Sequence, residues 1–281
     1  MYYMFIVIST VLFAGQFVLS KEFQKLNGSS LQAALRFSAQ TSIVSFCVML
    51  FLAGFHIDCS AFSLFWAFAN SCITVSCSYC GIKALKTANL SVYSVFNMLG
   101  GMLLPFLYGI FFFGEIFTIG KLLCCVLIGV SLVLSMEDSK ENNGAVKYYA
   151  ACFILNGLVG VVAKIHQSHE TAVNSPSFMA MSSIFTFVIS SVLLITRAKK
   201  PSRINKRDFK FTISYAICNG IGNLLLLIAL KYVDASVQYP LVTGGVIVFS
   251  AIASYLQKNK MRLQNILAVI AAFLATVFVI L

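Results

Sequence analysis

The chain carries one hydrophobic pattern twice, with a shift of 145 residues and no gap. Ala84 to Lys86 recur as Ala229 to Lys231, and Met136, where the last apolar run of the first copy ends, coincides with Leu281. Each copy holds five long apolar segments. Because five is an odd number, the second copy must cross a membrane in the opposite sense from the first. Inverted repeats of this kind build many secondary transporters.

The composition agrees with a lipid environment. Soluble domains are about 45–50% apolar and about 25% charged, whereas this chain is 59% hydrophobic and 10% charged. At roughly 20 residues per membrane-spanning helix, the chain has room for ten spans with short connections. We therefore predict an all-α membrane protein with ten transmembrane helices, arranged as a 5+5 inverted-topology repeat around a central cavity. The predicted spans are 2–20, 30–53, 62–82, 88–113, 118–136, 148–166, 175–197, 211–230, 235–257 and 262–281.

These spans divide the chain into a first five-helix repeat, 1–136, a polar linker, 137–147, and a second five-helix repeat, 148–281. The net charge is +11, and the basic residues lie between spans, which favours a membrane surface and no nucleic acid as the partner of this charge. The odd-numbered connections hold 17 of the 20 basic residues. The positive-inside rule then predicts that both termini lie outside. We expect the membrane to be the plasma membrane.

Polar residues at membrane depth are the candidates for function, because such residues are costly unless they face the bundle interior or a wet cavity. Asn219 and Asn223 lie four residues apart on one face of the eighth segment. The shift of 145 residues maps them onto Thr74 and Ser78 in the third segment. Hydrogen bonding between helices and the lining of a cavity both explain such pairs. Their symmetric placement favours the cavity.

Five more residues complete the predicted substrate-binding set: Tyr93, Asn97, Asn156, Gln238 and Tyr239. Pro105 and Pro240 each remove a backbone hydrogen bond and are predicted to kink or hinge their spans. They do not occupy equivalent positions of the two copies, so they are a weak guide to a binding site.

No carboxylate lies deep in a span. A proton-coupled cation antiporter keeps a titrating acid at depth, so we expect a neutral or zwitterionic substrate, or a facilitator. Common catalytic and phosphate-binding motifs are absent from the sequence, and we predict no catalytic residue, no metal site and no cofactor. His166, His169 and Glu170 are the only nominees for a reactive cluster. They define an alternative function, an intramembrane enzyme or a lipid-carrier flippase subunit.

Two stretches of the sequence carry a family resemblance. Ala84 to Val92 reads Ala-Leu-Lys-Thr-Ala-Asn-Leu-Ser-Val, and its equivalent, Ala229 to Val237, reads Ala-Leu-Lys-Tyr-Val-Asp-Ala-Ser-Val. Gly114 to Gly120 reads Gly-Glu-Ile-Phe-Thr-Ile-Gly. The chain resembles the EamA-like branch of the drug/metabolite transporter superfamily. Gln257 to Lys260 departs from the family pattern, since a Gly-Glu turn is typical there.

The resemblance implies ten helices in two inverted repeats. It also implies a cavity lined by spans one, three, four, six, eight and nine, with spans five and ten at the periphery. Its members are usually described with both termini in the cytoplasm, the opposite of the orientation that the charge count predicts. The combined prediction is a secondary transporter or facilitator that moves a small organic metabolite, amino acid- or amine-like, by alternating access. The expected partners are this small molecule and the lipid bilayer, and the sequence leaves a monomer and a homodimer open.

Overall fold

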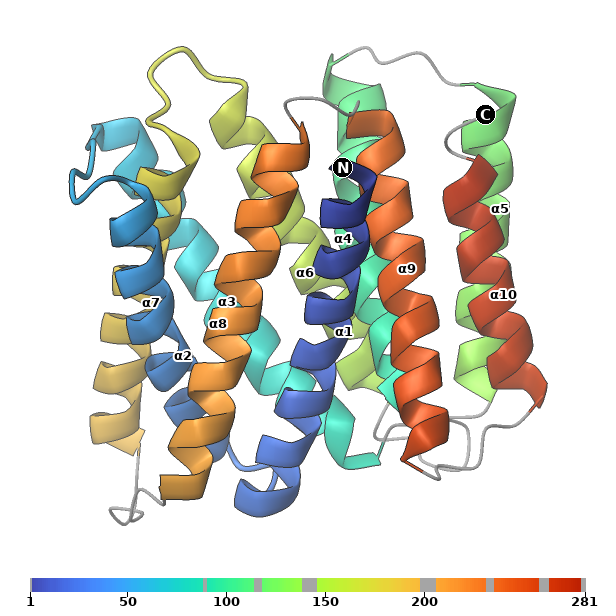
Figure 1. The fold of residues 1–281 in the computed structure, drawn as a ribbon, viewed down its shortest axis with the longest axis horizontal. Coiled ribbons are helices and arrows are strands. Elements are labelled where there is room, and N and C mark those ends of the chain that lie inside the picture. Colours follow the sequence, from blue (N-terminus) through green and yellow to red (C-terminus); the bar gives the residue numbers. More distant parts are fainter. Residues whose placement is uncertain are drawn as a thin grey trace.

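A computed structural model describes residues 2–87, 90–113, 118–137, 146–197, 206–230, 235–257 and 263–278. Within these residues the chain is helical and has no strand. The elements, shown in Figure 1, are α1 (Tyr2–Asn27), α2 (Leu31–Leu52), α3 (Ala61–Thr87), α4 (Leu90–Phe113), α5 (Ile119–Glu137), α6 (Val146–Gln167), α7 (Ser175–Arg197), α8 (Lys206–Leu230), α9 (Ala235–Leu256) and α10 (Leu263–Phe278).

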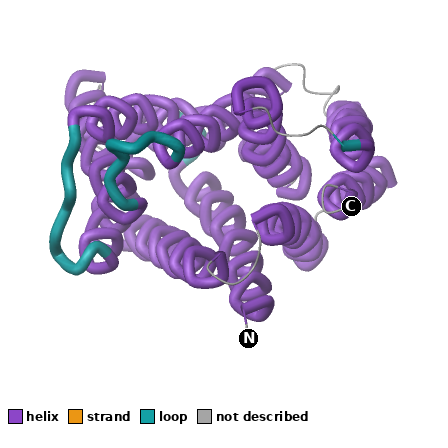
Figure 2. Tube along the Cα trace, turned by 90° about the horizontal axis from the view of Figure 1, so that it is seen from above, coloured by secondary structure: helices purple, strands orange, loops and turns teal. Residues whose placement is uncertain are grey.

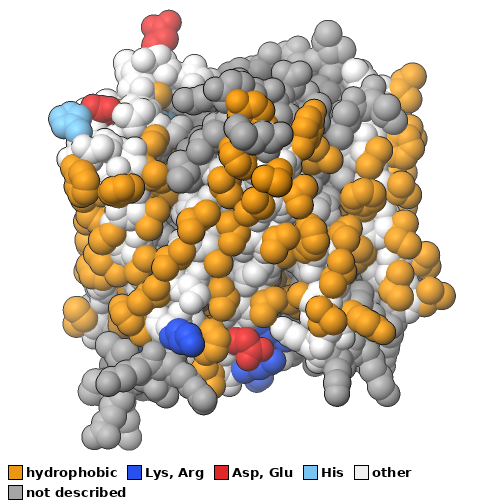
Figure 3. Space-filling model, viewed as in Figure 1, with side chains coloured by type: hydrophobic (Ala, Val, Ile, Leu, Met, Phe, Trp, Pro, Cys, Tyr) orange, Lys and Arg blue, Asp and Glu red, His pale blue; other side chains and the backbone are white. Residues whose placement is uncertain are grey.

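Six of these helices are long and apolar enough to cross a membrane, namely α1, α2, α3, α4, α6 and α7. Shorter apolar helices occur within α5, α9 and α10. Large apolar side chains such as Phe65, Phe111 and Ile195 are mostly exposed on the outer surface. Figure 3 shows hydrophobic side chains spread over the middle of one face, with charged side chains at its upper and lower edges. This arrangement is that of a multi-pass membrane protein, in which lipid covers the apolar belt.

Each predicted span corresponds to one helix, but several helices are longer than their apolar runs. α1 continues to Asn27, seven residues past the predicted end, and α3 continues to Thr87. The added turns are packed inside the protein, since Phe23 and Ala84 are both fully buried. The length of the apolar run matches the thickness of the hydrocarbon core of the bilayer, whereas the helix continues through the polar interface.

The helices pack side by side into a bundle, seen from above in Figure 2. The most extensive contacts join α1 to α8, α2 to α7, α4 to α6 and α5 to α10, and each of these pairs takes one helix from either half of the chain. The ends of α1 and α10 that carry the two termini lie at the same end of the bundle (Figure 1). The motif turns at 88–89, 114–117, 231–234 and 258–260 lie outside the described residues.

Candidate functional site

A cavity of about 450 Å³ lies within the bundle. Its described lining comes from eight helices, and α5 and α10 contribute none of it. The volume falls in the range of pockets that hold small organic ligands. The polar lining residues are Gln16, Ser20, Ser38, Thr41, Ser42, Ser45, Asn70, Thr74, Cys77, Ser78, Tyr93, Asn97, Asn156, Ser182, Ser183, Thr186, Tyr215, Asn219 and Asn223.

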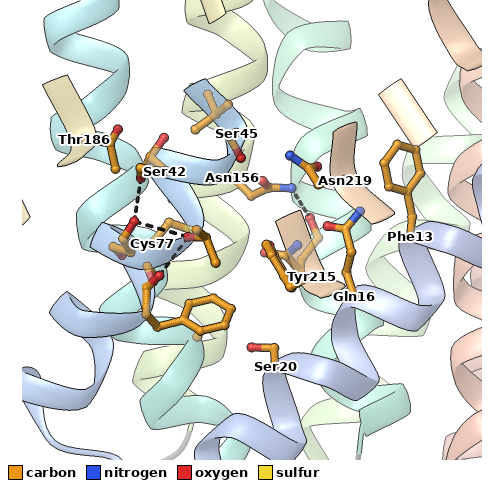
Figure 4. A pocket seen from close by; sticks show the side chains of 18 of the residues that line it. Phe13, Gln16, Ser20, Ser42, Ser45, Cys77, Asn156, Thr186, Tyr215 and Asn219 are labelled. Carbon is orange, nitrogen blue, oxygen red and sulfur yellow. Dashed lines mark hydrogen bonds between the residues drawn. The ribbon is translucent and has the colours of Figure 1, made fainter. Parts of the chain in front are cut away.

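The cavity brings together seven of the nine residues predicted to bind substrate. These residues are Thr74, Ser78, Tyr93, Asn97, Asn156, Asn219 and Asn223. The side chains of the other two, Gln238 and Tyr239, lie outside the described part of the chain, as does that of Pro240. Figure 4 shows Asn156 and Asn219 beside Gln16 and Tyr215 on one side of the cavity.

The lining differs from the one that the family resemblance implied, because α2 and α7 also line the cavity. Ser38 and Thr41 come from α2, and Ser183 and Thr186 come from α7. Sequence reasoning missed them because single hydroxyls inside long apolar runs usually bond to their own helix. The repeat contained the signal, however, since the shift of 145 residues maps Ser38 onto Ser183 and Thr41 onto Thr186.

The hydroxyls of α2 and α7 form one side of the cavity, which we call the hydroxyl wall (Ser38, Thr41, Ser42, Ser45, Ser182, Ser183 and Thr186). Thr41 Oγ1 donates to the carbonyl oxygen of Phe37 at 2.8 Å, and Thr186 Oγ1 donates to that of Ser182 at 2.8 Å. Both hydroxyl protons are therefore used within their own helices. The lone pairs of these oxygens stay available as acceptors.

Amides from α1, α4, α6 and α8 form the opposite side, which we call the amide wall (Gln16, Asn97, Asn156, Asn219 and Asn223). Asn156 Nδ2 donates to the backbone oxygen of Asn97 at 2.7 Å, so it joins α6 to α4 and lines the cavity as well. Asn223 Nδ2 donates to the side-chain oxygen of Asn219 at 3.1 Å. Both interpretations, helix contact and cavity lining, thus apply to Asn156, whereas the bond of Asn223 lies within α8.

Four buried polar atoms on the cavity lining have no hydrogen-bond partner within the protein. They are Gln16 Nε2, Ser38 Oγ, Ser78 Oγ and Asn97 Oδ1. Buried polar groups are nearly always paired, because an unpaired one costs about 1–3 kcal/mol. These atoms come from both walls and from α3 between them. Each of these atoms is itself buried beneath the cavity surface, so a polar solute or water reaches it only after the neighbouring side chains shift.

Aromatic side chains close the cavity toward one end. Phe17 and Tyr93 make an edge contact with ring centroids 5.3 Å apart, and Phe37 and Tyr215 make another at 4.9 Å. Phe37 also contacts Phe23, and these residues pack with Ile82 near the end of α3. We call this group the aromatic end cluster (Phe23, Phe37, Ile82, Phe211 and Tyr215).

A second group lies at the other end of α3, where His166 is buried between helices. Its Nε2 lies 2.9 Å from Ser63 Oγ, and its ring stacks on Phe178 with centroids 3.9 Å apart. We call this group the histidine end cluster (Ser63, Trp66, Ala67, His166 and Phe178). Ser63 and Ile82 are separated by 19 residues of α3, so the two clusters lie about 28 Å apart along the helix axis. The cavity residues Asn70 to Ser78 lie between them.

The two histidines of the alternative function lie in different surroundings, although both rings stack on Phe62. His166 is 1% exposed and paired with Ser63, whereas His169 is at the surface, where it stacks on Phe62 and bonds to Thr171. Among the described residues, no group of three His, Cys, Asp or Glu side chains is placed to hold a metal ion.

Pro105 lies inside α4, and its ring packs on Gly160 of α6. A Cβ atom built at Gly160 would approach Pro105 Cγ to 2.4 Å. Gly160 therefore lets the two helices approach at this level of the bundle, as small residues do between membrane helices.

Comparison with known proteins gives a family match for the second half of the chain. Residues 145–281 match the EamA-like transporter family, part of the drug/metabolite transporter superfamily. Its members are membrane transporters of small molecules and not enzymes. The resemblance found in the sequence is thus confirmed over this range.

A search of curated proteins gives no match. Among solved structures 26 chains match, and one of them, a crystal structure of another protein, has a TM-score of 0.63 at 15% identity over 96% of this chain and 96% of that chain. At this identity the likeness concerns the fold alone.

Proposed function

We propose that this protein is a secondary transporter or facilitator that carries a small organic solute across the plasma membrane by alternating access. The cavity is the proposed substrate site, and Thr74, Ser78, Asn219 and Asn223 are proposed to contact the solute. The observation that carries this proposal is the repeat-related placement of polar pairs around one cavity. The shift of 145 residues maps the lining pair of α3 onto the lining pair of α8. It also maps Ser38 and Thr41 of α2 onto Ser183 and Thr186 of α7.

The helix packing supports two five-helix repeats, 1–136 and 148–281, joined by the linker 137–147. Each helix of one copy has an equivalent in the other copy, five helices away in the chain. When every helix is replaced by its equivalent, the α1–α8 contact becomes the α3–α6 contact, and the α4–α6 contact becomes the α1–α9 contact. The α2–α7 and α5–α10 contacts map onto themselves. The position of both termini at one end of the bundle also supports opposite directions for the two copies, because each copy has five helices (Figure 1).

The two end clusters are suited to act as gates. The shift maps Trp66 and Ala67 of the histidine end cluster onto Phe211 and Thr212, and Phe211 belongs to the aromatic end cluster. They are thus built at equivalent positions of the two copies but at opposite ends of the cavity. Opening one cluster while the other stays packed would expose the cavity to one side of the membrane at a time.

The described charges favour the cytoplasm at the end where α1 and α3 finish. Lys21, Lys25, Lys83 and Lys86 all lie there. We therefore propose that both termini lie outside. In a background without reactive cysteines, Tyr2→Cys is expected to react with an impermeant maleimide in intact cells and Lys25→Cys is not. The reverse pattern would contradict the orientation.

Counterflow in proteoliposomes tests the transport activity. The full chain is reconstituted in vesicles loaded with unlabelled uridine, leucine or choline, and exchange of the same radiolabelled probe is followed. At least one probe is expected to exchange faster than in empty vesicles. Replacing Asn219→Ala and Asn223→Ala together is expected to slow this exchange at least tenfold, because two cavity amides are lost.

Ser131→Ala is the matched control. Ser131 in α5 is buried and donates to the backbone oxygen of Ala268 at 2.8 Å, so this variant also loses a buried contact between helices, but away from the cavity. It is expected to keep its exchange rate. Exchange that persists unchanged in the double variant removes these residues from the site, and the absence of exchange for all three probes contradicts transport.

A further inference from the structure

The composition of the cavity lining restricts the class of solute that the cavity can bind. Among the described residues that line it, none is Asp, Glu, Lys, Arg or His. Ten Ser and Thr hydroxyls and six Asn and Gln amides supply most of the polar groups. A charged group moved from water into such a site loses its hydration without gaining an opposite charge, and this is costly.

The ends of α1, α3, α6 and α8 do not supply the missing charge. Broken helices let some transporters aim helix termini at a charged substrate group. Here α1, α3, α6 and α8 continue for at least five residues beyond their outermost lining residues in both directions. The field of a helix end falls off within its last turn. A carboxylate or an ammonium group therefore finds no counter-charge among these four helices.

The two walls differ in the hydrogen bonds they offer. Thr41 and Thr186 on the hydroxyl wall use their protons within their own helices, so they present acceptors. A solute that bonds to Thr41 and Thr186 must bring donors, and neutral hydroxyl groups meet that need.

The amide wall carries amide donors and acceptors on four helices. Gln16 Nε2 and Asn97 Oδ1 have no partner within the protein, although both atoms are themselves buried. Side-chain amides pair well with planar groups that carry an adjacent donor and acceptor, as Asn and Gln do with the edges of nucleobases. The rings of Tyr93 and Tyr215 also line the cavity and can pack on the face of such a group.

We propose that the solute is uncharged, with several hydroxyl groups at one end and a planar, amide-bearing ring at the other, which is the chemistry of a nucleoside. The hydroxyls face α2 and α7, and the ring faces the amide wall. The volume of about 450 Å³ suits a solute of this size. This inference rests on the proposed function and specifies the substrate class of the same cavity.

Cys77 provides a reporter of binding that is independent of transport. It lies on the cavity lining and is partly accessible, whereas Cys124 and Cys152 are buried. The test protein keeps these three cysteines, and the remaining six, which are accessible, are replaced by serine: Cys47, Cys59, Cys72, Cys80, Cys125 and Cys218. A small methanethiosulfonate reagent is expected to modify Cys77, and the same protein with Cys77→Ser is expected to stay unlabelled.

Uridine is expected to protect Cys77 from the reagent, and leucine and choline at the same concentration are not. In a variant with Thr41→Val and Thr186→Val, the uridine concentration for half-protection should rise about 5- to 10-fold, as expected for lost hydrogen bonds. Protection by 2′,3′-dideoxyuridine, which lacks the 2′ and 3′ hydroxyl donors that are expected to face Thr41 and Thr186, should not change. Thr196→Val is the control, since Thr196 lies on α7 and bonds to its own helix but is exposed outside the cavity.

Protection and counterflow together separate this inference from the proposed function. Protection by uridine without exchange of any probe would overturn transport and leave the solute class standing. Exchange or protection with leucine or choline, and none with uridine, would overturn the solute class and leave transport standing. Equal weakening of uridine and dideoxyuridine in the Thr41/Thr186 variant would overturn the assignment of the hydroxyl wall.

Discussion

The contacts α4–α6 and α1–α9 occupy equivalent positions in the two copies but are built differently. In the α4–α6 interface, Gly100 faces the backbone of Phe153, Gly157 faces Leu104, and Gly160 faces Pro105. A Cβ atom at each of these glycines would approach its neighbour to between 2.1 and 2.6 Å. The α4 and α6 backbones therefore approach each other closely along several turns.

The α1–α9 interface is looser. Gly245, the equivalent of Gly100, faces only the side chain of Thr10, at 2.8 Å from a built Cβ atom. Gly15, the equivalent of Gly160, has no neighbour within 4 Å of that position. Side chains can rotate out of the way, whereas a backbone cannot. We therefore expect α4 and α6 to move together as one body, and α1 and α9 to slide against each other when the cavity opens.

The largest effect on stability is expected at the first pair of equivalent glycines, Gly100 and Gly245. Gly100→Ala places its Cβ atom 2.1 Å from the carbonyl oxygen of Phe153, so the helices must separate. We expect a loss of about 3 kcal/mol in unfolding free energy, at the upper end for overpacking. Gly245→Ala should cost about 1 kcal/mol, because the obstacle is a methyl group of Thr10. Thermal unfolding in detergent measures both, and equal shifts would refute the difference between the interfaces.

At the second equivalent pair, Gly160 and Gly15, substitution by alanine should change the stability in opposite directions. Gly160→Ala forces its Cβ atom against the rigid ring of Pro105 and is expected to cost about 2 kcal/mol. Gly15→Ala meets nothing and gains up to about 1 kcal/mol of helix propensity. The same melting experiment compares them. If Gly15→Ala destabilised the protein as much as Gly160→Ala, the α1–α9 interface would be as closely packed as α4–α6.

This difference between the interfaces could not be predicted from the sequence. The repeat predicted the order of the helices and the lining pairs Thr74/Ser78 and Asn219/Asn223, because polar residues that recur at the same depth share a spatial role. Which glycine meets a backbone depends on the distance between helices, and no periodicity encodes that distance. Gly160 and Gly15 are equivalent in sequence, yet only one of them faces a neighbour.

The ends of the helices were also beyond prediction by apolar runs. Lys21 is 7% exposed although it is charged, because α1 continues past the apolar run and packs there. The hydroxyls of α2 and α7 were predictable in principle, since Ser38 and Thr41 recur as Ser183 and Thr186. Their role depends on the packing of α2 on α7, which brings the hydroxyl side chains of both helices to one cavity.

A smaller effect on stability is expected from the hydrogen bond across the α4–α6 interface. Asn156→Ala removes the donor to the backbone oxygen of Asn97, and such bonds between membrane helices contribute about 0.6 kcal/mol on average. Its equivalent in the other copy is Val11, which is 48% exposed, and Val11→Ala should change the melting temperature less. A larger effect of Val11→Ala would mean that the bond of Asn156 does not hold the interface.

The smallest expected effect is a recovery of stability in double variants. It distinguishes a new Cβ atom that meets a side chain from one that meets the backbone. Thr10→Ala should recover about 0.5 kcal/mol of the loss caused by Gly245→Ala, because it removes the methyl group that the new Cβ atom meets. Phe153→Ala should recover none of the loss caused by Gly100→Ala, since the nearest atoms there are the carbonyl group and Cα of residue 153, which this substitution keeps. Two double-mutant cycles of unfolding free energy measure these couplings. Rescue in the second cycle would show that the α4–α6 interface adjusts by side-chain rearrangement, and the expected rigidity of that pair would then be wrong.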